Sequence, residues 1–366
     1  MIDINIFNIN KTDYATPSLF LGDKPGLFDT VNKQYPKLWD LYKKMKSLDW
    51  DENEFDFTPC LTEFKTCPKS VYDMMIKTLA WQWEADSVAA HNLVSVTAPF
   101  ISSSELFATW SRIGDNECLH SAAYSEIVRN SFDNPDEILS SILSEAKALQ
   151  RLSSVSAVFA KTYDVSHRLA LGQVARDSDE AYDAIFMLVV ALLALERIQF
   201  MASFAITFAI ADTGMFLPIG KSVQKICTDE LQVHVEVNKF ILRNELGTVR
   251  GKEAFARNLD TIKSLIKDVT DSELSWTDYM FTEGRELVGL NSDVIKDWVL
   301  FGTNDVYNFL GIQNEFKVVN KNPLGYMNDW IDINHNQASP QEEKVGNYLL
   351  GGLKDTAGDE VFELDF

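Results

Sequence analysis

The 366-residue chain is poor in cysteine, histidine and basic residues, and it lacks a long apolar run. Its four cysteines are scattered without a CxxC pair, which is typical of reduced thiols rather than a disulfide framework or an iron–sulfur cluster. The longest apolar stretch, 185–195, is too short to span a bilayer. No basic segment followed by an apolar one opens the sequence, so we expect no secretory signal. These absences predict a soluble cytoplasmic protein that does not enter membranes.

The net charge of the chain excludes further classes of binding partner. The formal net charge of −21 would repel DNA, RNA and acidic lipid surfaces. We therefore expect neither a nucleic-acid partner nor a membrane partner. The sequence also lacks a glycine-rich phosphate-binding loop, so we do not expect this chain alone to bind a nucleotide substrate.

Apolar residues recur at helical spacing from about residue 68 onward, with few glycines or prolines inside long segments. No strand pattern and no internal repeat are visible. Several of the expected helices approach thirty residues, roughly 45 Å, which favours a long bundle of the all-α class. A short helix is expected over 31–47 and a loop over 48–67. The longer helices are expected at 69–97, 102–130, 135–151, 153–175, 178–212, 217–245, 251–286 and 292–310.

The two ends differ from this helical body. Residues 1–30 contain two prolines and two glycines and predict an irregular arm. Residues 333–366 contain a proline and several glycines and end in GDEVFELDF, which predicts a flexible tail. We therefore expect one helical domain over 1–332, followed by the tail.

One of the five histidines, His120, follows Glu117 by three residues, which places both side chains on one helix face. Helical bundles that hold two iron or manganese ions use two such pairs and one carboxylate from each of two other helices. A single Glu-x-x-His pair often occurs by chance in a helix, so the remaining ligands must also be identifiable in the sequence.

The other candidates are acidic residues in apolar surroundings. Asp86 lies in the middle of an expected helix, and Glu196 interrupts the apolar segment MLVVALLALERIQFMASFA. An ionised carboxylate buried alone is prohibitively costly, so each must reach solvent, be paired or bind a metal. Glu230 and His234 complete a candidate two-metal set, which comprises Asp86, Glu117, His120, Glu196, Glu230 and His234.

Oxygen ligands with two imidazoles suit iron or manganese better than zinc or calcium. Tyr124 follows His120 by four residues and shares its helix face. A tyrosine aimed at a metal pair that activates O2 is a candidate for one-electron oxidation. The alternative is an ordinary core tyrosine.

Several segments resemble the small subunit of class I ribonucleotide reductases, and the likeness runs from about residue 17 to the end. NECLHSAAYSEIVRN resembles the segment with a metal-binding Glu, a metal-binding His and the radical tyrosine. ALERIQFMASFA resembles the segment with a bridging Glu and the apolar pocket around the radical, here Phe200 and Phe204 with Ile226 from a later helix. ICTDELQVH resembles the last ligand helix, and SWTDYMFTEGRELVGLN and SPQEEKVGNYLLGGL also resemble family segments.

This resemblance implies a ferritin-like bundle whose six candidate residues bind two metal ions and whose Tyr124 stores a radical formed with O2. Trp50 and Asp229 match the positions that link the metal site to the protein surface, with Asp229 hydrogen-bonded to the non-ligating nitrogen of His120. Tyr348 matches the tyrosine that relays the oxidising equivalent to the large subunit. The resemblance implies that the large subunit reduces ribonucleotides, as diphosphates, to deoxyribonucleotides.

The resemblance also implies partners. The terminal peptide, residues 361–366, matches the segment that docks on the large subunit, by aromatic anchoring with ordering on binding. Its alternative is a merely solubilising acidic end. The resemblance further implies a homodimer, di-iron in preference to di-manganese, and a ferredoxin or flavoprotein reductant.

One spacing departs from the family pattern, because Glu230 and His234 are four residues apart where the family usually has three. In a regular helix the extra residue turns the imidazole by about 100°. A π-helical bulge absorbs one residue and is common at functional sites. We therefore predict a π-bulge around residues 230–234 that returns His234 to the metal.

Two other functions fit part of the pattern. A ferritin-like oxidase or monooxygenase would use the same metal pair on a small molecule, and it would need neither Tyr348 nor the tail. An iron-storage or structural helical protein would leave Tyr124, Trp50 and the terminal peptide unexplained.

Overall fold

The structure is a computed structural model that describes residues 18–23, 26–144 and 146–332. Within these residues the chain is helical, and pairing between extended segments is limited to the isolated bridges Phe20–Ile101 and Leu287–Leu290. The expected all-α class is thus confirmed. The helices, in chain order, are α1 (Pro36–Ser47), α2 (Thr58–Thr66), α3 (Lys69–Thr97), α4 (Ser104–Ser131), α5 (Pro135–Leu143), α6 (Ala146–Ala170), α7 (Asp179–Ala194), η2 (Leu195–Gln199), α8 (Met201–Ala211), α9 (Leu217–Asp229), η3 (Glu230–His234), α10 (Val235–Leu246), α11 (Val249–Met280), α12 (Ser292–Leu310) and α13 (Tyr326–Ile331).

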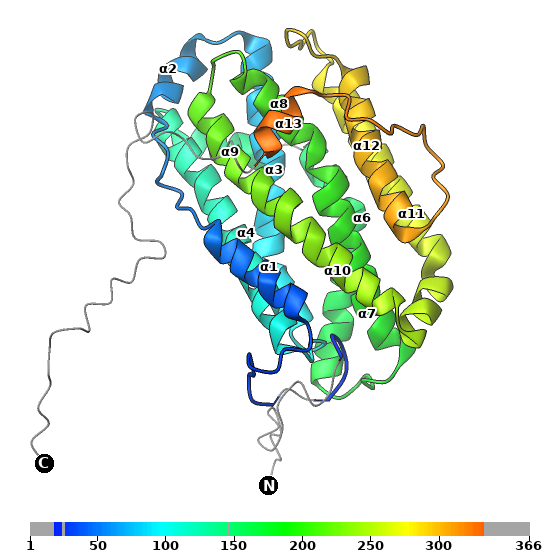
Figure 1. The fold of residues 1–366 in the computed structure, drawn as a ribbon. Coiled ribbons are helices and arrows are strands. Elements are labelled where there is room, and N and C mark those ends of the chain that lie inside the picture. Colours follow the sequence, from blue (N-terminus) through cyan, green and yellow to red (C-terminus); the bar gives the residue numbers. More distant parts are fainter. Residues whose placement is uncertain (1–17, 24–25, 145, 333–366) are drawn as a thin grey trace, which may run out of the picture.

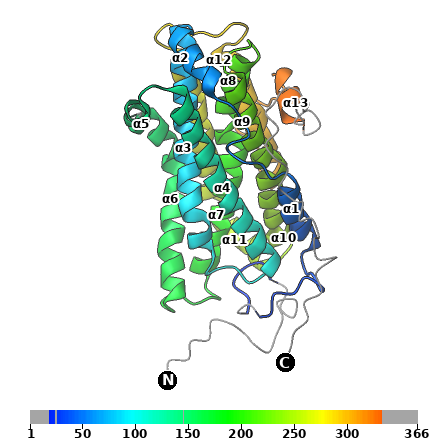
Figure 2. The same cartoon turned by 90° about the vertical axis from the view of Figure 1, so that its left-hand side faces the viewer.

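The long helices lie along one common direction and form an elongated bundle (Figures 1 and 2). Helix α3 packs against α4, α6 and α8, and α7 packs against α6, α10 and α11. Four helix starts are fixed by side-chain caps, in which a hydroxyl or amide oxygen accepts an N–H of the first turn. These caps are Ser103 for α4, Ser178 for α7, Thr248 for α11 and Asn291 for α12.

Most of the expected helices are confirmed, and those over 69–97 and 292–310 have the expected bounds. Three expectations are wrong. The break expected at residue 152 lies between Leu143 and Ala146, where α5 ends and α6 begins. The helix expected over 251–286 ends at Met280. The loop expected over 48–67 contains α2, whose start is favoured by a proline in its first turn.

The most apolar helical segment, Asp179–Ala211, is long enough to cross a membrane, yet its most apolar 18-residue stretch is wholly buried inside the bundle. It comprises α7, η2 and α8 and runs through the middle of the molecule, surrounded by the other long helices (Figure 1). Its composition therefore reflects a central core helix, and Glu196 lies in the middle of it.

This central helix and the α9–η3–α10 helix each contain one π-helical turn, η2 and η3, and the two turns contact each other. A π-turn leaves backbone carbonyls without regular partners, and cationic side chains from other helices supply them here. Arg151 of α6 donates to the carbonyl of Gln199 in η2 (2.9 Å), and Lys44 of α1 donates to the carbonyl of Gln232 in η3 (3.0 Å).

Helix α12 approaches η2 closely at Gly302. A Cβ atom added there would lie 2.6 Å from the carbonyl oxygen of Arg197, which is shorter than a real contact allows. Replacing Gly302 by alanine is therefore expected to destabilise the metal-free protein by about 1–3 kcal/mol, measured as a lower midpoint of thermal unfolding. Gly325→Ala is the matched control, because a Cβ there meets nothing within 4 Å. Equal stability of the two variants would contradict this packing.

Candidate metal centre

Four helical segments bring the six predicted ligands together in the middle of the bundle. They form two groups whose ligand atoms lie within 4.8 Å of one another, and every member is buried. Glu117 and Glu230 belong to both groups, and Glu196 belongs to one. Glu117 and Glu230 therefore lie between the two groups, whereas Glu196, which is expected to bridge, is a member of the second group. The first group is Asp86, Glu117, His120 and Glu230, and the second is Glu117, Glu196, Glu230 and His234.

The π-helical turn predicted around residues 230–234 is confirmed, because η3 spans Glu230–His234. It returns the imidazole of His234 to the carboxylates despite the four-residue spacing, with Nδ1 of His234 2.7 Å from Oε2 of Glu230 and 3.5 Å from Oε1 of Glu117. The second π-turn, η2, was not predicted. It carries Glu196, so both central helices widen where they supply a ligand.

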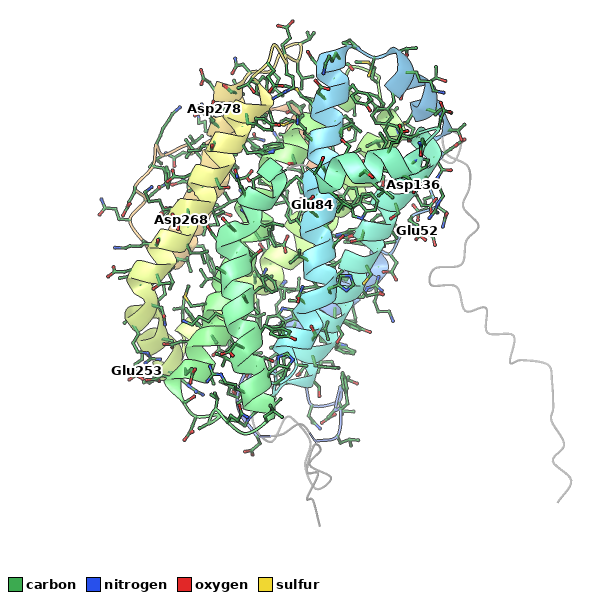
Figure 3. The ribbon with its side chains drawn as sticks, turned by 180° about the vertical axis from the view of Figure 1, so that it is seen from behind. Glu52, Glu84, Asp136, Glu253, Asp268 and Asp278 are labelled. Atoms are coloured by element: carbon green, nitrogen blue, oxygen red, sulfur yellow. The ribbon has the colours of Figure 1, made fainter. Side chains whose placement is uncertain are left out.

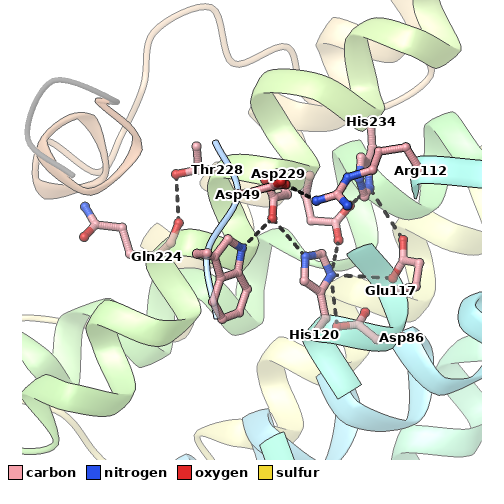
Figure 4. A network of polar contacts seen from close by, with 11 residues as sticks. Asp49, Asp86, Arg112, Glu117, His120, Gln224, Thr228, Asp229 and His234 are labelled. Carbon is pink, nitrogen blue, oxygen red and sulfur yellow. Dashed lines mark hydrogen bonds and ion pairs between the residues drawn. The ribbon is translucent and has the colours of Figure 1, made fainter. Parts of the chain in front are cut away.

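His120 faces the carboxylates with one ring nitrogen and the bundle exterior with the other. Its Nδ1 lies 3.2 Å from Oε1 of Glu230, 3.6 Å from Oε2 of Glu117 and 3.8 Å from Oδ2 of Asp86. In Figure 4 the ring lies between Asp229 on one side and Glu117 and Asp86 on the other. Both histidines thus direct Nδ1 toward the space that the carboxylates enclose.

The donor set fits a pair of divalent cations. Four carboxylates are buried side by side, and no lysine or arginine among the described residues forms an ion pair with any of them. Both carboxylate oxygens of Asp86 and Oε2 of Glu196 are buried and have no hydrogen-bond partner among the described residues. Such a cluster is very costly unless cations neutralise it. Oxygen and imidazole donors are those that iron and manganese accept.

The electrostatics of the cluster point the same way. Burial and then the charge of Glu117 raise the pKa of Asp86 well above its usual value, and burial and then Glu230 do the same to the pKa of Glu196. Burial alone would lower the pKa of His120, but hydrogen bonds to Asp229, Glu117 and Glu230 raise it. Asp86 and Glu196 thus favour their protonated forms, and His120 attracts a proton, because positive charge is in short supply here. Glu230 differs, because burial alone would raise its pKa, but its contacts with His234 and His120 lower it well below the usual value.

Tyr124 lies beside this cluster on α4, and only 1% of its surface is exposed. Burial first, and then the charge of the neighbouring Asp86, raises the pKa of its phenol well above 10. Phe200 and Phe204 stack at 5.6 Å between ring centroids, and Ile226 is buried in the same apolar cluster. The phenol is therefore buried and favours its protonated form.

A hydrogen-bonded connection runs from His120 toward the surface. Nε2 of His120 lies 3.2 Å from Oδ2 of Asp229, and the same oxygen accepts a hydrogen bond of 2.9 Å from the indole nitrogen of Trp50. The indole ring lies nearly parallel to the imidazole, 6.1 Å away. The predicted link between His120, Asp229 and Trp50 is thus present in the structure.

Sequence reasoning missed the residues that support this connection. Arg112 of α4 forms an ion pair with Asp49, the neighbour of Trp50 (Figure 4). This contact attaches the segment that carries Trp50 to the helix that carries Glu117 and His120. Asp115, one turn further along α4, forms a second ion pair with Arg112 at 2.6 Å. A single arginine between two aspartates gives no recognisable sequence signal, because the three residues meet only in the fold. Tyr348 and the terminal peptide, residues 361–366, lie outside the described residues.

The chain matches the family model described as ribonucleotide reductase, small chain, over residues 27–323. Among curated proteins it is similar to ribonucleoside-diphosphate reductase subunit beta of Buchnera aphidicola from Baizongia pistaciae, with 24% identity over 98% of both chains. It is also similar to the Haemophilus influenzae protein of that name, with 25% identity over 95% of both chains, and to that of Enterobacteria phage T4, with 21% identity over 97% of both.

Solved structures share the fold. The ribonucleotide reductase R2 subunit from Clostridium botulinum superposes with a TM-score of 0.73 at 18% identity, over 87% of this chain and 95% of that one. A Streptococcus sanguinis protein described as dimanganese(II) superposes with a TM-score of 0.65 at 13% identity, over 81% of this chain and 96% of that one.

Proposed function

Because the chain belongs to the ribonucleotide reductase small-chain family, as the beta subunit of a ribonucleoside-diphosphate reductase, we propose that its buried carboxylate–histidine centre generates a radical on Tyr124. The observation that carries this proposal is the position of His120. One ring nitrogen faces the ligand cluster and the other reaches Trp50 through Asp229. A storage protein has no use for such an exit, whereas a subunit that exports an oxidising equivalent needs one.

The six buried residues would hold two metal ions, with Glu117 and Glu230 between them. We propose iron as the physiological metal, with manganese as the alternative that the same donors accept. Bound there, the metal pair would supply, with O2, the oxidising power that removes one electron and one proton from Tyr124. In the manganese case a flavoprotein would deliver the oxidant, and a ferredoxin or flavoprotein would supply electrons for reactivation.

The protein's own residues then control the phenol. Because the pKa of Tyr124 is raised, the phenol stays neutral until it is oxidised, and the proton it loses then needs a nearby base. Asp86 is the carboxylate placed to accept it. The apolar surroundings keep water and solutes from the neutral radical, which lengthens its life.

The route outward would use Trp50, whose N–H donates to Asp229. When the indole is oxidised, Asp229 can accept its proton, so a positive charge need not persist in the interior. Beyond Trp50 we propose Tyr348 as the relay to the large subunit, which reduces the ribonucleotide, and residues 361–366 as the docking peptide.

We also propose a flexible tail over 333–366 after a single domain, a homodimer and a cytoplasmic location, all by resemblance to the family.

Reconstitution tests this function directly. The metal-free protein, given Fe(II) and O2, is expected to bind about two iron ions per chain and to show an organic radical in electron paramagnetic resonance. Addition of the large subunit should then give deoxyribonucleotide. Iron binding without any organic radical, combined with oxidation of a small molecule, would favour the oxidase alternative instead.

Metal binding should also release protons. Burial raises the pKa of Asp86 and of Glu196, so the metal-free site retains protons that the metal must displace. The apparent metal affinity is therefore expected to rise with pH, by about tenfold per pH unit for each displaced proton. Calorimetric titrations in two buffers that differ in protonation enthalpy measure this number. A buffer-independent heat would contradict the assignment of these carboxyls as ligands.

A further inference from the structure

Two further tryptophans, Trp81 and Trp276, lie beneath the face of the bundle opposite to α1, α9 and α10. Figure 3 looks onto this face, where α6 runs between α3 and α11. The guanidinium of Arg151 on α6 stacks on Trp81 of α3 and on Trp276 of α11, with its Cζ 3.8 Å from each ring centroid. Both indoles and the arginine are almost completely buried. The helix contacts and the two equal distances thus place the cation between the two rings.

This stack extends from the metal centre toward solvent. Trp81 precedes Asp86 by five residues on the same helix, and its ring centroid lies 6.4 Å from that of Phe200, which follows Glu196 by four residues. Trp276 and Arg151 line a cavity of about 90 Å³ together with the exposed residues Gln150 and Ser275. A chain of aromatic rings therefore leads from the site to a solvent-accessible cavity, away from Trp50.

Trp50 and Trp81 contact groups of opposite charge. Removal of an electron from an indole leaves a radical cation that is stabilised by a nearby anion and by a proton acceptor. Trp50 has both, because its Nε1 donates to the carboxylate of Asp229. The buried Nε1 of Trp81 has no hydrogen-bond partner in the described part of the chain, and the ring faces a guanidinium. Oxidation of Trp81 is therefore opposed by Coulomb repulsion and by the lack of a base.

Glu273 holds this cation in place. Its two carboxylate oxygens accept hydrogen bonds of 2.7 Å from Nε and Nη2 of Arg151. Burial lowers the pKa of Arg151 to about 10, which still leaves the guanidinium charged at neutral pH. Glu273 offsets part of the charge, but the guanidinium is the group in contact with both rings.

We propose that Arg151 determines the direction of radical transfer: it keeps Trp81 and Trp276 reduced, which closes this face and leaves Trp50 as the exit. This inference rests on the proposed radical function of Tyr124. Without the guanidinium, the Tyr124 radical would take an electron from Trp81 and a proton from a neighbouring carboxyl. Trp81 would take an electron from Trp276, and Trp276 from a reductant in solvent such as ascorbate, which is oxidised by one electron and releases the replacing proton.

The test removes the ion pair as a unit, so that neither charge is left buried alone. Arg151→Met with Glu273→Leu replaces it with apolar side chains of similar size, an exchange that proteins often tolerate. Arg151→Gln with Glu273→Gln serves as a second version. After reconstitution with Fe(II) and O2, the tyrosyl radical is followed by electron paramagnetic resonance during incubation with ascorbate. We expect the radical to decay at least about fivefold faster in the variant than in the wild type, with iron content unchanged.

A rescue experiment separates this role from a structural one, because Arg151 also donates to the carbonyl of Gln199 beside Glu196. Adding Trp81→Phe to the double variant should restore the decay rate to within about twofold of the wild type, since phenylalanine is much harder to oxidise. Trp110→Phe is the matched control, as Trp110 is equally buried and its Nε1 is also without a partner. It should not restore the rate.

Each outcome has a clear meaning. Faster decay with rescue by Trp81→Phe and not by Trp110→Phe supports the proposal. An unchanged or slower decay in both double variants, or rescue that fails, overturns it while leaving the radical function intact. A wild-type protein that binds iron and forms no tyrosyl radical overturns the radical function and this inference together.

Discussion

Replacing Tyr124 by phenylalanine is expected to abolish the organic radical and to lower turnover with the large subunit by about a thousandfold or more. Phenylalanine keeps the ring that fills the apolar interior but lacks the hydroxyl that loses a proton on oxidation. Tyr124 is not a member of either ligand group, so removal of its hydroxyl leaves all six candidate ligands in place. The fold and the metal content should therefore remain as in the wild type. Electron paramagnetic resonance and metal analysis on the same sample measure both quantities.

The matched control for this variant is Tyr182→Phe, which removes a second, similarly buried tyrosine hydroxyl in a different part of the bundle. Tyr182 donates to Glu245, so this variant loses stability but should retain the radical. A radical signal that persists in Tyr124→Phe would show that the oxidised group is another residue.

Replacing Trp50 by phenylalanine is expected to separate radical storage from radical export. In the proposed route the indole of Trp50 carries the oxidising equivalent beyond Asp229, and phenylalanine cannot donate the hydrogen bond to Oδ2 of Asp229. Turnover with the large subunit should fall by about a hundredfold or more, whereas the reconstituted protein alone should still form the tyrosyl radical. Activity assays with the large subunit in excess, together with radical quantification, make this comparison.

The control for Trp50 is Trp39→Phe, because Trp39 stacks on Tyr42 of the same helix and has no contact with Asp229. Asp229→Asn gives an independent test of the route. It keeps the size of the side chain but removes the negative charge that stabilises an oxidised indole. Full turnover by Trp50→Phe, with the radical present, would contradict the export route through Asp229.

The ligand set could be predicted from the sequence because its chemistry conflicts with its surroundings. Asp86 and Glu196 stand in apolar helical segments, where an acidic residue needs a special reason. The π-turn at 230–234 could be predicted because the spacing of Glu230 and His234 breaks a known pattern. The π-turn at Glu196 could not be predicted, because Glu196 is not paired with a second ligand on its own helix. Without such a pair there is no spacing that could reveal an extra residue.

The residues that support the site lay beyond sequence reasoning for a related reason. Lys44 and Arg151 donate to backbone carbonyls of the π-turns, and backbone carbonyls leave no trace in the sequence. Helix α2 was missed because it has only 9 residues, of which only Cys60 and Phe64 are buried, so it shows little helical periodicity. The candidate ligands could thus be predicted from local sequence patterns, whereas the side chains that support them could be identified only in the folded structure.

The central claim, a two-metal centre formed by these six side chains, is tested most directly by anomalous X-ray diffraction from crystals of the iron- or manganese-loaded protein. The account predicts two anomalous peaks per chain in the space enclosed by the two ligand groups, with Glu117 and Glu230 contacting both ions. A single ion, or two ions bound elsewhere with His234 directed away from them, would contradict it.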